Sequence, residues 1–156
     1  MACRTVRNME EIEIRRATPD QAGTLTALML ASSAYQGEYA SILDGYEITP
    51  GYVEANPTFT AAGDGGILGF YALTEAELDL LFVADSAQGL GIGARLITHM
   101  LAEARERGLA SVRVVSHPPA LAFYVRMGAR RTGTIPAKPP KVGWDRPELR
   151  FDVPTC

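Results

Sequence analysis

A glycine-rich segment stands between an apolar, strand-like run that ends at Val83 and a helix-like run that follows Ala94. Glycines let backbone N–H groups approach a ligand closely, and the amino end of a helix adds roughly half a positive charge. The segment therefore predicts a phosphate-binding loop, made of Gln88, Gly89, Leu90, Gly91, Ile92, Gly93 and Ala94.

Three kinds of phosphate-binding loop compete for this segment. A nucleoside-triphosphate loop ends in Gly-Lys-Ser/Thr, whereas Ala-Arg follows Gly93 here. The dinucleotide fingerprint G-x-G-x-x-A matches residues 89–94, but no acid stands about 20 residues further on, at residues 114–117. The third pattern, Q/R-x-x-G-x-G/A, matches residues 88–93 and is retained.

Two other chemistries find little support. Ser116 stands beside His117, but neighbours on a strand point to opposite faces and no G-x-S-x-G turn occurs, which argues against a serine hydrolase. No metal site is expected, because the chain has two histidines and its two cysteines, Cys3 and Cys156, lie at opposite ends. We expect the second histidine, His99, on the surface of a helix.

Composition predicts one globular domain over residues 1–156, with a flexible start at 1–9. Of the 156 residues, 47% are hydrophobic and 21% charged, which makes disorder and coiled coil improbable. No apolar run approaches the roughly 20 residues that span a bilayer and no signal-like stretch is found, so we expect a cytoplasmic protein. The net charge divides unevenly: residues 8–85 carry −11 and residues 86–156 carry +6, which favours a cationic and an anionic partner respectively.

Hydrophobic periodicity and turn residues predict a mixed order of strands and helices. Strands are expected at residues 12–14, 58–62, 67–73, 77–83, 111–116, after 129 and at 149–153. Helices are expected at residues 22–29, within 37–57, at 94–108 and at 118–127. The fold class is therefore α/β, with a parallel crossover around the helix at 94–108.

A second motif stands at residues 120–128, Ala-Leu-Ala-Phe-Tyr-Val-Arg-Met-Gly. It is similar to the A-x-x-F-Y-x-K/R-x-G signature of the GNAT superfamily of acyl-CoA-dependent N-acyltransferases, and residues 88–93 resemble that family's loop. The order of elements matches over roughly residues 12–153. The resemblance implies a GNAT-like α/β (α+β mixed) fold, with one splayed mixed β-sheet of about six to seven strands flanked by about four helices.

The resemblance also implies acetyl-CoA as acyl donor. Its pantetheine arm would pair with the backbone near Phe82 and Val83 where the sheet splays, and its pyrophosphate would meet the amides of residues 88–94. His117 stands where the family often has a coenzyme-holding Asn, and the alternatives for it are a helix cap or an exposed position. The coenzyme-binding residues implied are Leu81, Phe82, Val83, Gln88, Gly89, Leu90, Gly91, Ile92, Gly93, Ala94, His117, Ala120 and Phe123.

Acyl transfer from a thioester to an amine needs a neutral amine, a polarised carbonyl and a proton for the leaving thiolate. By the resemblance, Tyr124 supplies that proton and the Val83 N–H polarises the carbonyl. Glu77 and Asp79 stand two apart on a strand, hence on one face. Either could activate the amine through water, or both could be ordinary solvated acids.

The acceptor side is expected from residues 32–57 and the proline-rich loop at 135–147. Aromatic side chains supply flat apolar surface there: Tyr35, Tyr39, Tyr46, Tyr52 and Trp144. Acids supply negative charge: Glu38, Asp44, Glu47 and Glu54. This mixture suits a small cationic amine.

The sequence thus predicts an N-acetyltransferase that transfers an acetyl group from acetyl-CoA to a small cationic amine, directly, within a ternary complex. Two alternatives stay open: a protein N-terminal or lysine acetyltransferase, and a non-catalytic acyl-CoA-binding sensor or interaction subunit. We expect no metal, nucleic acid or membrane partner, and a homodimer through the terminal strands stays open.

Overall fold

The computed structural model describes residues 12–33, 35, 37–43, 45–140 and 142–155. The expected flexible start, Cys3, Asp44 and Cys156 lie outside these residues. Seven strands form one sheet: β1 (Glu13–Arg16), β2 (Thr58–Gly63), β3 (Gly66–Thr74), β4 (Glu77–Val83), β5 (Ser111–Val115), β6 (Arg130–Ile135) and β7 (Arg146–Asp152). Four α-helices flank it: α2 (Ala22–Leu30), α3 (Pro50–Ala55), α4 (Ile92–Glu106) and α5 (Leu121–Arg126). Short 3-10 turns complete the fold: η1 (Pro19–Gln21), η2 (Gly37–Leu43), η3 (Asp85–Ala87) and η4 (Pro118–Ala120).

The sheet has the order β1-β2-β3-β4-β5-β7-β6, antiparallel throughout except for the pair β4 and β5. Helix α4 makes the crossover between these two parallel strands, as expected for a strand–helix–strand unit. The predicted mixed sheet and its helices are therefore confirmed. No helix within the described residues has the length and apolarity to cross a bilayer.

Local signals explain where the helices begin. The Gln21 side chain accepts a hydrogen bond from the Thr18 N–H at 3.0 Å, as the capping box before α2 predicts. Helix α4 starts at Ile92, two residues before the expected Ala94, because Gly91 adopts the left-handed conformation and serves as its N-cap. The expected helix at 118–127 divides into η4 and α5.

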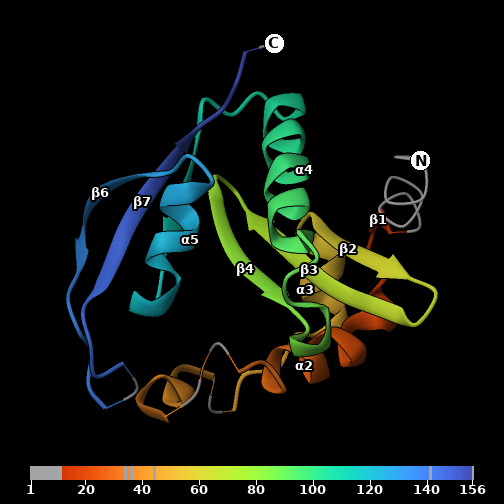
Figure 1. The fold of residues 1–156 in the computed structure, drawn as a ribbon, viewed down its shortest axis with the longest axis horizontal. Coiled ribbons are helices and arrows are strands. Elements are labelled where there is room, and N and C mark those ends of the chain that lie inside the picture. The colour runs from red at the N-terminus through yellow and green to blue at the C-terminus, as the bar shows by residue number, and fades with distance from the viewer. Residues whose placement is uncertain (1–11, 34, 36, 44, 141, 156) are drawn as a thin grey trace.

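The two halves of the sheet meet at one point. The register of β4 and β5 contains a single pair, Glu77 with Arg113, and the Arg113 N–H donates to the Ala76 carbonyl at 2.8 Å. The Arg113 guanidinium also contacts the Glu77 carboxylate at 3.2 Å and the carboxylate of Glu148 on β7. Beyond this point β4 and β5 diverge, as Figure 1 shows, which confirms the splayed sheet.

A bulge in β4 accompanies the divergence. Leu73 of β3 faces Leu78 and Ala72 faces Leu80, so Asp79 is the extra residue. A bulge increases the local twist of a strand and re-aims its side chain. Asp79 is exposed there, one strand residue away from buried Leu78.

Each face of the sheet buries its own core. Helices α4 and α5 pack Leu96 and Tyr124 against one face, whereas α2 and α3 pack Leu25 and Val53 against the other. Burying one such aliphatic side chain contributes about 1.5–3 kcal/mol. The splay is thus supported from both sides by helices.

The expectation that His99 lies on the surface of a helix is wrong. Its ring is half-buried against Phe59, and Nδ1 lies 2.7 Å from the hydroxyl of buried Tyr71. Burial lowers the pKa of His99 below its ordinary value. The sequence pattern missed it because α4 buries part of the flank that carries His99 as well as its main apolar face.

Close packing of α4 on the sheet depends on Gly69. A Cβ there would lie 2.9 Å from the Phe82 carbonyl oxygen and 3.2 Å from Ile92. We expect Gly69→Ala to lower the free energy of unfolding by about 1–3 kcal/mol, measured by urea denaturation. The control Gly23→Ala, exposed on α2 with open space around it, should instead raise stability by up to about 1 kcal/mol. Equal effects of the two substitutions would contradict this packing.

Candidate active site

A cavity of about 810 Å³ occupies the space where β4 and β5 diverge. Its wall combines the whole of β4, the glycine loop with the start of α4, the end of β5, α5, and residues of the segment that follows α2. Predicted site residues that line it are Glu77, Asp79, Leu81, Phe82, Val83, Gln88, Gly89, Gly91, Ile92, Gly93, Ala94, His117, Ala120, Phe123, Tyr124, Tyr35 and Tyr46.

The glycine loop has the backbone of an anion-binding turn. Gly89 and Gly91 have φ of 82° and 77°, a conformation that side chains rarely adopt, and a Cβ at Gly91 would meet nothing within 4 Å. The space beside these amides is therefore open, at the amino end of a 15-residue helix. These residues fit a coenzyme pyrophosphate.

The two sequence motifs are in contact. A Cβ at Gly93 would lie 3.1 Å from the ring of Phe123 on α5, so only glycine lets this ring approach the start of α4. The Gln88 side chain donates to the Val83 carbonyl at 3.1 Å and fixes the loop to the end of β4. Leu90 in contrast is 51% exposed and is not part of the cavity wall.

The backbone of β4 turns toward the cavity at Leu81 and Val83. The Ala84 N–H donates to Leu68 on the β3 side at 2.8 Å. Because bonding direction alternates along an antiparallel ladder, the N–H groups of Val83 and Leu81 face the opposite edge, toward β5. The backbone N–H and C=O groups of Phe82 point toward its partner Phe70 on β3, and the residue is 5% exposed.

Tyr124 stands on α5 with its side chain in the cavity wall. It is 8% exposed and packs edge-on against Phe123, with ring centroids 5.3 Å apart. Burial raises the pKa of Tyr124 well above its ordinary value, and the nearby Tyr35 raises it further. Its hydroxyl is therefore protonated at neutral pH, as a proton donor must be.

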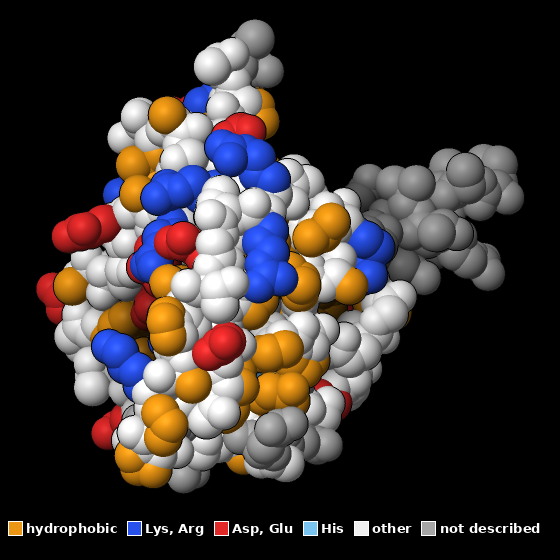
Figure 2. All heavy atoms as spheres, turned by 90° about the vertical axis from the view of Figure 1, so that its left-hand side faces the viewer, with side chains coloured by type: hydrophobic (Ala, Val, Ile, Leu, Met, Phe, Trp, Pro, Cys, Tyr) orange, Lys and Arg blue, Asp and Glu red, His pale blue; other side chains and the backbone are white. Residues whose placement is uncertain are grey.

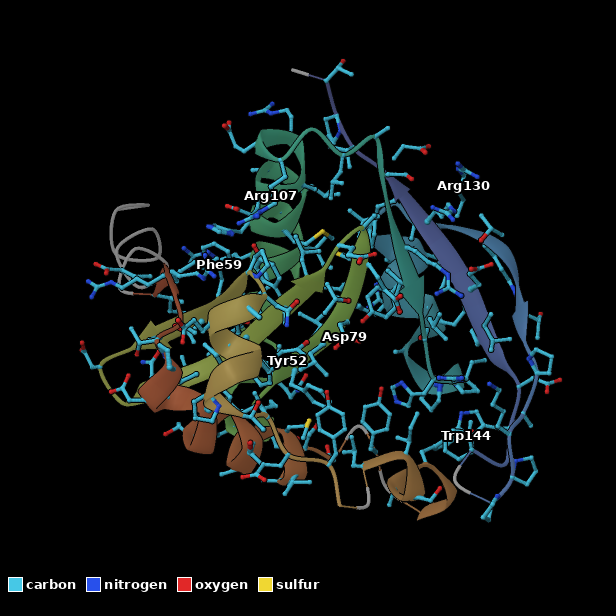
Figure 3. All side chains as sticks on the ribbon, turned by 180° about the vertical axis from the view of Figure 1, so that it is seen from behind. Tyr52, Phe59, Asp79, Arg107, Arg130 and Trp144 are labelled. Carbon is cyan, nitrogen blue, oxygen red and sulfur yellow. The ribbon has the colours of Figure 1, made fainter. Side chains whose placement is uncertain are left out.

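The two acids of β4 differ in their partners. Glu77 forms an ion pair with Arg113, whereas Asp79 accepts a hydrogen bond from the Tyr52 hydroxyl at 2.6 Å. Burial, the bond to Asp79 and the charges of both acids raise the pKa of Tyr52. Figure 3 shows Tyr52 beside Asp79. Sequence reasoning missed this bond, for which no local pattern exists.

Aromatic rings cross the open end of the splay. Tyr35 stacks on His117 at 4.1 Å between centroids and lies 5.6 Å from Phe82, so it joins the end of β5 to β4. Tyr39 packs edge-on against His117 and against Trp144, at 5.7 and 4.8 Å. His117 is 6% exposed, and its ring stacks on Tyr35 rather than capping η4.

Positive charge is divided between the cavity and the outside of the sheet. Figure 2 shows Lys and Arg side chains gathered over the side that carries β6 and β7. Arg130 there contacts Asp152 at 3.1 Å. Arg126 and Arg146 line the cavity, and the sequence analysis did not select either as a site residue. The positive charge of residues 86–156 is therefore not confined to the cavity.

Several residues expected at the acceptor side are not in the cavity wall. Glu47 and Glu54 are exposed outside the cavity wall. Tyr39 contacts the rings of His117 and Trp144, but neither Tyr39 nor Trp144 lines the cavity. Asp44 falls outside the described residues. Among the residues that the structure describes, no group of three His, Cys, Asp or Glu side chains could hold a metal ion.

Comparison with known families agrees with this geometry. A family model described as Acetyltransferase (GNAT) domain matches residues 47–136, which include β4, the glycine loop and α5. The chain therefore belongs to the GNAT family of acetyltransferases.

Two curated relatives are similar over part of the chain. Blasticidin-S acetyltransferase of Streptomyces morookaense is 38% identical over 80 residues, 50% of this chain and 59% of the relative. The 5-NmdU N-acetyltransferase of Pseudomonas phage PaMx11 is 40% identical over 74 residues, 44% of this chain and 53% of the relative. The chain thus spans little more than half the length of these relatives.

Similarity of the fold extends much further than similarity of sequence. The structure of yncA from Salmonella typhimurium, solved with acetyl-CoA, has a TM-score of 0.74 and covers 94% of this chain and 96% of its own, at 16% identity. At this identity the likeness shows the shared fold alone.

The loop geometry predicts how a charge at Gly91 would act. Gly91→Glu places a carboxylate where a phosphate would bind, so we expect it to abolish the rise in melting temperature that acetyl-CoA causes in the parent protein. The control Gly108→Glu stands at the other end of α4, with the same φ of 77° and equally open surroundings, and should keep the rise. Thermal denaturation with and without acetyl-CoA measures both. An unchanged rise in Gly91→Glu would overturn the assignment of the loop.

Proposed function

We propose that the protein is an N-acetyltransferase that transfers an acetyl group from acetyl-CoA to the amine of a small acceptor, directly, within a ternary complex. The observation that carries the proposal is one continuous cavity that joins the glycine loop, Tyr124 and Asp79. Acetyl-CoA, when bound, supplies the acetyl group as an activated thioester.

The splay supports the binding and polarisation of the donor. The residues that would hold it are the amides of the loop from Gln88 to Ala94 and the edge of β4 at Leu81 and Val83, where N–H groups face the cavity. A fixed N–H donor in a site away from water can contribute several kcal/mol to transition-state stabilisation. The Val83 N–H is the donor that suits the thioester oxygen.

Proton transfer is divided between two side chains. Tyr124 keeps its hydroxyl proton at neutral pH and can give it to the leaving thiolate. Asp79 accepts the proton of the acceptor amine, directly or through water, and Tyr52 holds its carboxylate in place. Glu77 is less suited because Arg113 occupies one of its carboxylate oxygens.

The aromatic rings across the open end of the splay favour a small acceptor over a protein segment. A polypeptide acceptor needs an open groove, whereas Tyr35 joins β4 to His117 across this end. The acids that face the cavity also favour an amine that is positively charged before it loses its proton.

Direct transfer is supported by the surroundings of Ser116. This residue lines the cavity beside His117, but its hydroxyl donates to the His117 carbonyl oxygen at 2.7 Å. A serine whose proton goes to a carbonyl is not activated by an imidazole. Intersecting lines in two-substrate kinetics, rather than parallel ones, would agree with a ternary complex.

Removal of the Tyr124 hydroxyl tests the proton donor. Tyr124→Phe preserves the packing of the ring and acts on charge that develops during the reaction. We expect kcat to fall by roughly 10²-fold or more, with the dissociation constant of acetyl-CoA changed only a few-fold. The control Tyr71→Phe removes another buried hydroxyl, which contacts His99 outside the cavity, and should keep kcat. Near-normal turnover in Tyr124→Phe would contradict the role of Tyr124 as proton donor and leave it as a packing residue. If the unmodified protein released no CoA with any amine, the sensor alternative would be favoured.

Removal of the Asp79 charge tests the proton acceptor. We expect Asp79→Asn to lower kcat/KM by about tenfold or more at neutral pH, where most of a free aliphatic amine is protonated. The defect should shrink as the pH approaches the amine's own pKa of about 10, because the amine then arrives neutral. Asp64→Asn, in the exposed turn between β2 and β3, is the control. A defect that does not depend on pH would assign Asp79 to binding instead.

A further inference from the structure

Arg146 differs from Arg113 and Arg130, the two arginines that form ion pairs in the same half of the sheet within the described residues. It is the first residue of β7 and lines the cavity, and its Nε is buried without a hydrogen-bond partner among the described residues. Arg113 contacts Glu77 and Glu148, and Arg130 contacts Asp152. No described acid forms an ion pair with Arg146.

Arg146 lies in the part of the cavity wall where we expect the acceptor to bind. Its charge acts on the hydroxyl of Tyr35, whose pKa burial raises to about 12 and Arg146 lowers. Tyr35 stands in the segment after α2, across the open end of the splay. Trp144, two residues before Arg146, likewise has a buried ring N–H without a partner among the described residues.

A buried guanidinium N–H without a hydrogen-bond partner is costly unless a ligand satisfies it. Taking a charge out of water costs several kcal/mol, and buried polar groups almost always find partners. A guanidinium is permanently charged and presents its donors in a planar fork that matches the two oxygens of a carboxylate. The group that suits Arg146 is therefore an anion in the cavity.

We propose that Arg146 binds a carboxylate of the acceptor, so that the acceptor is a small amine that also carries a carboxylate. This inference rests on the proposed function and adds a second point of attachment. The amine lies toward Asp79 on β4 and the carboxylate toward Arg146 on β7, so opposite charges meet the two ends of one molecule.

The position of Arg146 separates it from the coenzyme phosphates. Those phosphates would fit the amides at Gly89 and Gly91, at the amino end of α4, whereas Arg146 stands on β7, in the other arm of the sheet. A carboxylate also suits the site better than a phosphate dianion, because Asp79 and Glu77 line the same cavity and repel a second negative charge.

Matched acceptors test the proposal in the unmodified protein. The probes are 4-aminobutyrate, 5-aminopentanoate and several α-amino acids, each compared with its carboxamide. A further probe, 3-aminopropylphosphonate, tests whether the site prefers a phosphate-like group. Release of CoA from acetyl-CoA is followed by mass spectrometry. We expect each accepted carboxylate to exceed its carboxamide in kcat/KM by roughly 10- to 100-fold, the range for a hydrogen-bonded charge pair. The phosphonate should fall below the carboxylate.

Substitution of Arg146 should erase this preference. In Arg146→Gln we expect KM for the carboxylate to rise to that of the carboxamide, with kcat and the acetyl-CoA dissociation constant nearly unchanged, because the contact is equal in ground and transition states. Arg146→Lys should restore part of the preference. The control Arg131→Gln removes an exposed charge on β6 and should keep it all.

Three results would overturn the proposal. They are equal use of acids and amides by the unmodified protein, an Arg146→Gln protein that keeps the preference, and a loss confined to acetyl-CoA affinity, which would assign Arg146 to the coenzyme. If no amine releases CoA, the proposed function fails separately. Calorimetric titration of the same acids and amides then decides on the carboxylate site, which requires that the acids bind more tightly and that Arg146→Gln removes the difference.

Discussion

The single contact between β4 and β5, at Glu77 and Arg113, is the constraint on which the rest of the structure depends. One backbone hydrogen bond and an ion network that includes Glu148 hold the two halves of the sheet together there. Because the strands part immediately afterwards, the edge of β4 at Leu81 and Val83 turns its N–H groups to a cavity instead of a neighbouring strand. A fully paired sheet would have no room for a coenzyme at its centre.

The opened sheet would expose apolar surface if nothing else covered it. Helices α4 and α5 cover one face, α2 and α3 cover the other, and Tyr35 joins the two arms at the far end. The remaining space is a pocket lined by the glycine loop, by the acids Glu77 and Asp79 of β4 and by Arg146 of β7. The charges that line the pocket are a better guide to its ligands than the net charge of either half of the chain, since Arg130 pairs with Asp152 outside the pocket.

Much of the fold and of the coenzyme site could be predicted from the sequence, because the signals are local. The loop at 88–94 can be recognised in the sequence by its glycines, two of which adopt a positive φ in the structure. The motif at 120–128 can be recognised by the spacing of its residues. Their contact through Gly93 and Phe123 explains why the two motifs occur together. The residues expected to bind the acceptor were predicted less well. Glu47 and Glu54 do not line the cavity, whereas Arg146 does. Arg146 stands in a proline-rich stretch that carries no motif.

By itself the sequence determined the order of strands and helices, the glycine turn before α4 and the place of Tyr124 on α5, because periodicity, caps and left-handed glycines act within a few residues. Only the tertiary structure decided that Asp79 is the bulged residue held by Tyr52, that His99 is half-buried on Tyr71, and that Arg146 lines the cavity without an ion pair to a described acid. These contacts join residues far apart in the chain. Their partners are chosen by the path of the whole backbone, which no local pattern records.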